Sequence, residues 1–419
     1  MNAENMTNLS VAGSQYGTDA APTPGGQGWF SPLGRLPLTT DRVRTTGAVR
    51  EHAGFFGHLG RALTEWQLPT DAPSNDLYPW KVRPALIALD GGKVLVAETG
   101  NGPEPQDLAG VFDLNSEPLL SYTSLDRHQH PSLIFAGSRV QASAPEQVGE
   151  DSAEPQLEHP VLVLLADFDR YLSLGDAPLN LQGFENQEQT LAEVIAARSG
   201  GSWVSVRDYA AFAYEGQGAA FAWGEVLAAA ASLSTWHASS GFDGRTGAPT
   251  YATRGGWVRV TDEGRELFPR TDPAVITAVT AEFGGESKIL LGQARAWGKG
   301  RFSTFAGFVE GGEALETAVL REVYEECGGL VVSLKYLGSQ PWPFPRSLMC
   351  GYLAVISNPN QVEADGAEIE EIRWFSRAEL LEAHRSGTVQ LPGPSSISRR
   401  LIEFWLGQSL GHPQKPAER

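Results

Sequence analysis

Cysteine is scarce in this chain of 419 residues, which contains only Cys327 and Cys350. Two thiols are too few for a disulfide framework. Both lie in segments that we expect to be buried, where a thiol packs as a small apolar side chain. The first residues lack a basic region followed by an apolar core, and no apolar run approaches the roughly 20 residues of a membrane span. We therefore expect a soluble, cytoplasmic protein with no membrane partner.

Positive charge is also under-represented, since 32 Lys and Arg residues face 50 Asp and Glu residues, a net charge of −18. Polymeric nucleic acids and anionic membranes attract proteins through basic patches. The charge balance therefore tells against polymeric nucleic acid as the main partner. It leaves open a capped RNA end presented to a pocket, and a small dinucleotide held by metal ions and a few arginines.

The first half of the chain shows organisation but few functional motifs. Its length and its 41% hydrophobic residues predict two or three domains with sizeable cores. We expect disorder over residues 1–28, which are rich in Gly, Pro, Thr and Asn. The segments that follow are strand-like runs at 85–98 and 159–168, an acidic insertion at 143–159 and an Ala-rich helix near 219–236.

The most informative stretch is GFVEGGEALETAVLREVYEECGGL, residues 307–330. Glu322, Glu325 and Glu326 stand at i, i+3 and i+4, so a helix would crowd them on one face, where like charges repel. A hard cation such as Mg²⁺ or Mn²⁺ would relieve this repulsion, because such ions prefer carboxylate oxygens and substrate phosphates. Glycines precede the helix, and Gly328 follows it at a C-cap position. The pattern predicts a strand, a loop and a helix around a cation site.

The spacing G-x5-E-x7-R-E-apolar-x-E-E-x-G, from Gly307 through Glu313 and Arg321 to Gly328, resembles the signature box of the Nudix hydrolases. Gly329 departs from the pattern, because the family usually carries an apolar residue there, although Leu330 follows at once. The alternative interpretation is an acidic, solvated helix face, which is what most Glu-rich runs are. Eight constrained positions in place favour the box.

The resemblance implies hydrolysis of a nucleoside diphosphate linked to another moiety, by attack of water on a phosphorus of the pyrophosphate. It implies that Glu322 and Glu326 are metal ligands, with Glu326 or Glu325 close to the attacking water. Glu313 and Arg321 would lock the loop onto the helix through an ion pair. The carbonyl of Ala306 is a further candidate ligand. The catalytic set implied by the resemblance is Arg321, Glu322, Glu325 and Glu326.

Downstream, in GSQPWPFPRSLM, three prolines alternate with Trp342 and Phe344. Prolines stiffen such a segment, so the two rings are held with little conformational freedom. Alone, this pattern is also typical of a structural loop or a proline-rich ligand. Its position after the box makes SQPWPFPRS resemble the tag of the NADH pyrophosphatases, which lines the dinucleotide pocket. The implied substrate contacts are Gln340, Pro341, Trp342, Pro343, Phe344, Pro345, Arg346 and Ser347.

Two later segments fit the same family. An acidic metal ligand is implied six residues before Trp374, which gives Glu368. The alternative is a wet surface loop, because Glu370 and Glu371 lie in the same run. The segment LPGPSSISRRLIEFWL resembles the closing loop and helix of the family, and there Ser398 takes a substrate-contacting position.

Residues 242–272 resemble the zinc ribbon that precedes the Nudix domain in this family, but the cysteines of its paired C-x2-C motifs are missing. Asp243 and Thr246 stand at the first pair, and the second pair falls within 260–264. Structural zinc sites use thiolate and imidazole ligands, and the segment has neither Cys nor His. We expect a ribbon remnant without structural zinc. An oxygen site of Asp243 and Asp262 has no supporting spacing.

The resemblance also implies a homodimer with a shared site. The base of the substrate would lie against Phe308 and against the partner subunit's Phe268. Both phenylalanines are also compatible with ordinary core packing.

The expected architecture is α+β. An α/β/α sandwich with a mixed sheet is expected at 273–410, after a ribbon-like segment at 236–272 and a separate α/β domain at 29–235, with a free tail at 411–419. The expected function is that of an NADH pyrophosphatase, which splits NADH or NAD⁺ into NMNH or NMN and AMP. Two alternatives stay open: a Nudix hydrolase of ADP-ribose, a CoA derivative or NAD-capped RNA, and a nucleotide-binding protein without turnover.

Overall fold

The computed structural model describes residues 43–44, 85–99, 102–108, 133–139, 159–165, 190–216 and 223–411. The expected disorder over 1–28, residues 143–158 of the acidic insertion and residues 412–419 of the tail lie outside the described residues. No described helix combines the length and apolar character that a membrane crossing requires.

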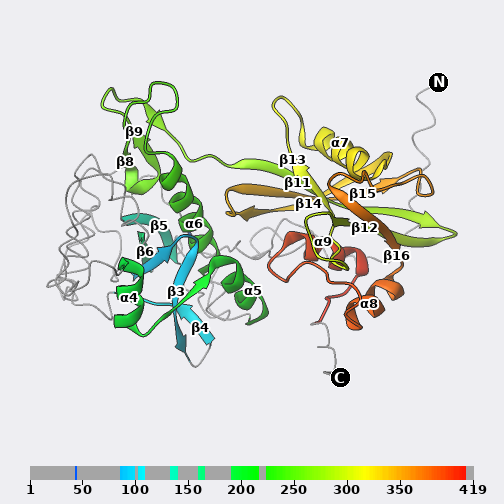
Figure 1. Cartoon of the computed structure of the whole chain (residues 1–419), viewed down its shortest axis with the longest axis horizontal. Helices are drawn as coiled ribbons and strands as arrows, with labels where there is room; N and C mark the ends of the chain where they lie inside the picture. The colour runs from blue at the N-terminus through cyan, green and yellow to red at the C-terminus, as the bar shows by residue number, and fades with distance from the viewer. Residues whose placement is uncertain are drawn as a thin grey trace, which may run out of the picture.

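The first sheet and its helices, α4 to α6, form what we call the N-terminal unit (Figure 1). Its described strands have the order β1-β5-β6-β2-β3-β4, with β7 beside β3; β2 and β6 are parallel and the other pairs antiparallel. The expected strands and the Ala-rich helix are confirmed. The elements are β1 Val43–Arg44, β2 Ala85–Asp90, β3 Lys93–Thr99, β4 Gly102–Pro105, β5 Leu133–Arg139, β6 His159–Leu165, α4 Leu191–Ser199, β7 Ser202–Ser205, α5 Val206–Gly216 and α6 Gly224–Ser239.

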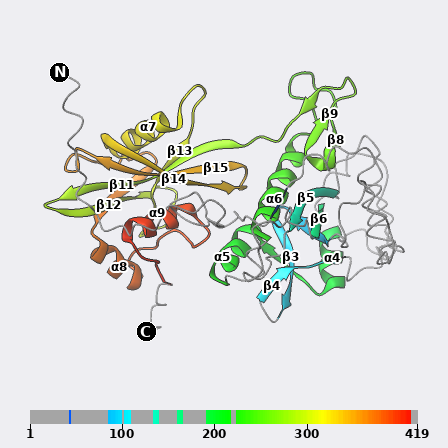
Figure 2. The same cartoon turned by 180° about the vertical axis from the view of Figure 1, so that it is seen from behind.

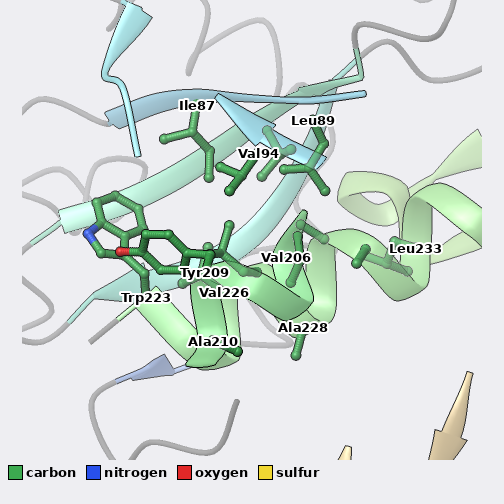
Figure 3. Packing of buried hydrophobic residues seen from close by; sticks show 14 of the residues in the cluster. Ile87, Leu89, Val94, Val206, Tyr209, Ala210, Trp223, Val226, Ala228 and Leu233 are labelled. Carbon is green, nitrogen blue, oxygen red and sulfur yellow. The ribbon is translucent and has the colours of Figure 1, made fainter. Parts of the chain in front are cut away.

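The core of the N-terminal unit lies between this sheet and helices α5 and α6 (Figure 3). Ile87, Leu89 and Val94 project from β2 and β3 toward the helices, and each is fully buried. Tyr209 of α5 and Val226 of α6 close the cluster from the other side. This apolar contact fixes α5 against the sheet.

The ribbon-like segment forms a small antiparallel sheet of β8 Tyr251–Thr253, β9 Val258–Val260 and β10 Glu266–Leu267. Asp243 is only 2% exposed and accepts hydrogen bonds from the Arg245 N–H at 3.1 Å and the Thr246 hydroxyl at 2.9 Å. The Arg265 guanidinium, 3.0 Å away, donates to the same carboxylate from the second turn. These bonds, the Arg245 N–H first, hold the pKa of Asp243 below its usual value. An ion pair thus joins the two turns where paired cysteines would bind zinc, so these residues do not fit that metal.

Arg259 links the ribbon to α6 through a buried polar network. Its guanidinium donates to the Thr250 hydroxyl at 2.8 Å and lies 3.0 Å from Nδ1 of His237. The other ring nitrogen of His237 lies 2.8 Å from the Gly256 carbonyl. Burial lowers the pKa of Arg259 to about 10. The ribbon is therefore anchored to the N-terminal unit by side chains.

We predict that the purified full-length protein contains no stoichiometric zinc. The Asp243 carboxylate already accepts hydrogen bonds from the Thr246 hydroxyl and the Arg265 guanidinium. Elemental analysis measures this directly. Dialysis against a chelator should also leave the melting temperature of the ribbon-containing chain unchanged. One zinc per chain that survives a weak chelator, with a lower melting temperature after its removal, would contradict the prediction.

The third sheet is mixed, with the order β14-β15-β11-β12-β16 and β13 beside β11. Strands β11 and β15 are parallel and the other pairs are antiparallel. Helix α7 covers one face, and α8 and α9 lie on the other (Figures 1 and 2). The elements are β11 Asp272–Phe283, β12 Glu286–Ala294, β13 Phe305–Phe308, α7 Leu315–Cys327, β14 Val331–Trp342, β15 Ser347–Ile356, β16 Ile369–Phe375, α8 Arg377–Arg385 and α9 Ile397–Leu406.

Alternating residues of β11 supply both faces of this sheet. Val275 and Val279 pack in the cluster that contains Val323 of α7. Ile276 packs with Leu401 on the face that α9 covers. The expected α/β/α sandwich with a mixed sheet is therefore confirmed.

Candidate active site

Strand β13 and helix α7 carry the first glycine and the last three glutamates of the box. Gly307 lies in β13 so close to Glu322 of α7 that a Cβ atom at this glycine would meet Oε1 of the glutamate at 1.9 Å. Helix α7 ends at Gly328 in the left-handed conformation (φ 67°), whose N–H donates to the Tyr324 carbonyl at 2.8 Å. The first glycine of the box therefore lets the Glu322 side chain approach the backbone closely, and the last glycine ends helix α7.

Arg321 connects the loop to the glutamates of α7. The expected ion pair with Glu313 is present, with Nε and Nη2 of the arginine each 2.9 Å from a carboxylate oxygen. The guanidinium also donates to the Phe308 carbonyl at 2.8 Å. Its remaining nitrogen donates to Glu322 at 2.7 Å and to Glu325 at 3.1 Å. These carboxylates, Glu313 first, raise the pKa of Arg321. Arg321 positions the glutamates and does not line the cavity described below.

Glu326 is the buried carboxyl of the box, with 7% exposure. One of its oxygens accepts a hydrogen bond from the Ala306 N–H at 3.2 Å. Burial, with the nearby charge of Glu322 and then those of Glu368 and Asp365, raises the pKa of Glu326 to about 8. A buried carboxyl whose ionised form is disfavoured by neighbouring carboxylates is a donor that suits a hard divalent cation.

The carboxylate side chains of the described residues are not arranged as a set of metal ligands. Among the described residues, no three His, Cys, Asp or Glu side chains are arranged to hold a metal ion. Arg321 holds Glu322 and Glu325, and the Glu325 side chain is 59% exposed. Glu368 is exposed in the loop before β16. Binding of a cation would therefore require these side chains to change rotamer.

Asp365 is a candidate site residue that the sequence patterns did not reveal. Its carboxylate accepts hydrogen bonds from the N–H groups of Glu368 at 3.0 Å and Ile369 at 2.7 Å. Its own N–H donates to the Glu326 carbonyl at 3.3 Å. These bonds hold the loop of Glu368 against the end of α7, so Asp365 places the fourth carboxylate near Glu326.

A cavity of about 390 Å³ adjoins this cluster. It brings together four of the residues expected from the sequence, namely Ala306, Gln340, Trp342 and Ser398. Ala306 links the carboxylate cluster to the cavity, because its N–H donates a hydrogen bond to Glu326 and the residue also lines the cavity. Residues of the cavity wall that the sequence did not predict include Arg207, Asp208, Trp297, Arg301, Ser303 and Thr304.

Gln340 and Ser398 form buried hydrogen bonds in the cavity wall. The Gln340 amide donates to the Ser395 carbonyl at 2.9 Å and accepts from the Ile397 N–H at 2.8 Å. The Ser398 hydroxyl lies 2.7 Å from that of Thr304 and 2.8 Å from that of Ser303. These bonds fix the start of α9 against β14 and the segment before β13, which gives the cavity a defined shape.

The rest of the proline-rich segment forms the end of β14 and the connection to β15. The rings of Trp342 and Phe344 meet edge to face at 5.3 Å. Arg346 pairs with Asp272 at 2.8 Å and thus fastens the connection to β11. Residues of the segment that are absent from the cavity wall are Pro341, Pro343, Phe344, Pro345, Arg346 and Ser347.

Phe268 and Phe308, the two expected stacking residues, lie on the surface with 57% and 59% exposure. Neither lines the cavity. Their exposure does not agree with the core-packing alternative.

A family model described as a NUDIX domain matches residues 270–391 of the chain. An NAD-capped RNA hydrolase named NudC, from Mycobacterium bovis (strain BCG / Pasteur 1173P2), is 42% identical over 190 residues, which cover 43% of this chain and 60% of the relative. An NAD-capped RNA hydrolase named NUDT12, from Homo sapiens, is 36% identical over 193 residues, which cover 43% of this chain and 41% of the relative.

The chain thus matches about half of the length of these curated relatives. The matched family model contains the loop, helix α7 and the proline-rich segment described above. We call residues 270–391 the Nudix domain, after the family model that matches them.

Proposed function

We propose that this protein hydrolyses the pyrophosphate bond of NADH or NAD⁺, giving NMNH or NMN and AMP. The observation that carries the proposal is the position of Ala306 between the carboxylates and the cavity. Its N–H donates a hydrogen bond to Glu326, and the residue lines the cavity. A dinucleotide with one half in the cavity would present its diphosphate to the carboxylates. The names of the mycobacterial and human relatives, both NAD-capped RNA hydrolases, support an NAD-type substrate.

The residues that would hold Mg²⁺ or Mn²⁺ are Glu322, Glu326 and Glu368, with the Ala306 carbonyl as a further ligand. Their fit rests on the burial of Glu326 and on the nearby charges of Glu322 and Glu368, which disfavour its ionised form. When bound, such a cation neutralises the diphosphate oxygens and acidifies a water molecule.

The residues of the chain supply the other requirements. Glu326, or Glu325 beside it, would accept a proton from water near the cation. Arg321 holds Glu322 against Gly307 and therefore orients the cluster. Trp297 and Trp342 offer aromatic surface in the cavity for a nicotinamide or adenine ring.

A second candidate substrate is an NAD-capped RNA 5′ end, because both relatives named above are NAD-capped RNA hydrolases. The net charge of −18 disfavours long contacts with the RNA backbone. We therefore expect the cap itself to provide most of the binding. Recognition would then be similar for the cap and for the free dinucleotide.

The proposal is tested by measuring kcat/KM for NADH, NAD⁺, ADP-ribose and a short NAD-capped RNA side by side, with Mg²⁺ or Mn²⁺. We expect the NAD-type substrates to exceed ADP-ribose. Faster hydrolysis of ADP-ribose would assign another substrate to the same chemistry. Binding of NADH without turnover of any substrate would favour the non-catalytic alternative.

We further propose a homodimer in which Phe308 and the partner subunit's Phe268 stack on the substrate base. Stacking of a base on an aromatic ring is worth about 1 to 3 kcal/mol. Phe268→Ala and Phe308→Ala should each weaken productive binding of NADH by roughly tenfold or more, without altering metal affinity. Light scattering and steady-state kinetics measure both parts. A monomer at working concentration whose kinetics are unchanged by Phe268→Ala would contradict the shared site.

A further inference from the structure

Helix α5 of the N-terminal unit meets the proline-rich segment of the Nudix domain. Phe344 packs against the apolar cluster that contains Tyr209 of α5. The guanidinium carbon of Arg207, in the first turn of α5, lies 5.1 Å from the centre of the Trp342 ring and 5.0 Å from that of Phe344. In both views of the molecule α5 lies on the side of the N-terminal unit that faces the Nudix sheet (Figures 1 and 2). The cavity is thus closed on one side by a residue from outside the Nudix domain.

Among the residues that the structure describes, none accepts a hydrogen bond from the Arg207 side chain. The residue is exposed. Asp208, the neighbouring acid in the cavity wall, is occupied locally, because its carboxylate accepts from the Ser205 hydroxyl at 2.7 Å. Contact with aromatic rings engages the face of a guanidinium and leaves its N–H edge available.

A second arginine of the same cavity shows the same arrangement. The guanidinium carbon of Arg301 lies 4.9 Å from the centre of the Trp297 ring. Among the described side chains and carbonyls, none accepts a hydrogen bond from this guanidinium either. The wall therefore combines two aromatic rings with two arginines whose side-chain N–H groups have no acceptor in the described part of the chain.

This combination suits a nucleotide. Aromatic rings accept a base by stacking, and the planar fork of an arginine matches two oxygens of a phosphate. An arginine already held against rings loses less conformational freedom when it binds, so more of the contact energy appears as affinity.

We propose that Arg207 is a substrate-binding residue which the N-terminal unit contributes to the Nudix cavity of the same chain, and that its guanidinium donates to a phosphate of the bound nucleotide. The proposal deepens the proposed function and rests on it for the identity of the dinucleotide. It makes the N-terminal unit part of the active site and not an appended domain.

The first test is kinetic and uses the full-length protein. Arg207→Gln should raise KM for NADH about tenfold and leave kcat within about twofold, because a charge-assisted hydrogen bond to the substrate is lost. Arg207→Lys, which keeps the charge but lacks the fork, should lie between this variant and the wild type. Arg385→Gln, a change of an exposed arginine on α8 that does not line the cavity, is the matched control and should not alter KM.

The second test measures equilibrium binding by calorimetry and needs no turnover. AMP and NMN are compared with their phosphate-free counterparts, adenosine and nicotinamide riboside. Arg207→Gln should weaken at least one nucleotide about tenfold and leave both nucleosides unchanged. Equal weakening of nucleotide and nucleoside would overturn the phosphate contact and assign Arg207 a packing role. Unchanged binding of all four compounds would overturn the proposal entirely.

The two tests separate this inference from the proposed function. If the wild type does not hydrolyse NADH, the proposed function fails, and the binding comparison still decides the role of Arg207. If the wild type hydrolyses NADH and both the kinetics and the binding of Arg207→Gln match the wild type, only the inference about Arg207 fails. A melting temperature of Arg207→Gln equal to that of the control variant excludes misfolding as the cause of a loss.

Discussion

Glu326→Gln is expected to lower kcat for NADH by about 10² to 10⁴, because the variant removes a ligand charge and a candidate proton acceptor in one step. Of Glu322, Glu325 and Glu326, only Glu326 is buried. Its carboxylate accepts a hydrogen bond from the N–H of the cavity residue Ala306. Glutamine keeps the shape of the side chain and can still accept that hydrogen bond. Steady-state kinetics with saturating Mg²⁺ or Mn²⁺ measures the effect.

The matched control for this variant is Glu316→Gln, which removes an exposed carboxylate from the first turn of the same helix. It should leave kcat within about twofold, as surface changes away from a site usually have small effects. Thermal denaturation of both variants checks that the fold is intact. Turnover of Glu326→Gln near the wild-type rate would mean that the box does not serve catalysis in this protein.

Gly307→Ala is the second change with a large expected effect. The added methyl group would lie 1.9 to 2.2 Å from the carboxylate atoms of Glu322, a distance that no packed atoms tolerate. The Glu322 carboxylate ends a flexible side chain, so it can move away at little cost to folding. The carboxylate would then lose its hydrogen bond with Arg321. A misplacement of about 1 Å in a catalytic site costs on the order of 10² in rate. We expect that loss in kcat/KM for NADH, with a nearly unchanged melting temperature.

Gly311→Ala is the control in the same loop. A Cβ atom at Gly311 meets nothing within 4 Å, and the residue does not have a positive φ. Its activity should match the wild type. A similar loss of activity in both alanine variants would mean that loop flexibility is what matters, and not the space that Gly307 provides for Glu322.

The site elements that were predicted from sequence are those in which local spacing determines geometry. Glutamates at i, i+3 and i+4 had to share one helix face, and the pair Glu313–Arg321 followed from the box pattern. The α/β/α sandwich with a mixed sheet was likewise confirmed, because long apolar runs such as that of β11 are typical of a strand buried on both faces.

The parts that were missed depend on contacts between distant segments. Arg207 lies more than one hundred residues before Trp342, and nothing in the sequence around α5 indicates a cavity wall. Asp365 belongs to an acidic run in which spacing from Trp374 pointed to Glu368 alone. The pair Asp243–Arg265 was also missed, since the arginine comes from the other turn; the sequence indicated only that zinc ligands are absent from this segment.

The most direct test of the central claim is identification of the products formed from NADH by the full-length protein, with and without Mg²⁺ or Mn²⁺. Chromatography with reference compounds resolves NMNH and AMP from NADH. We predict equimolar NMNH and AMP that appear only when the divalent cation is present and are lost in Glu326→Gln. Intact NADH after prolonged incubation with the cation, or cleavage at a bond outside the pyrophosphate, would contradict the account.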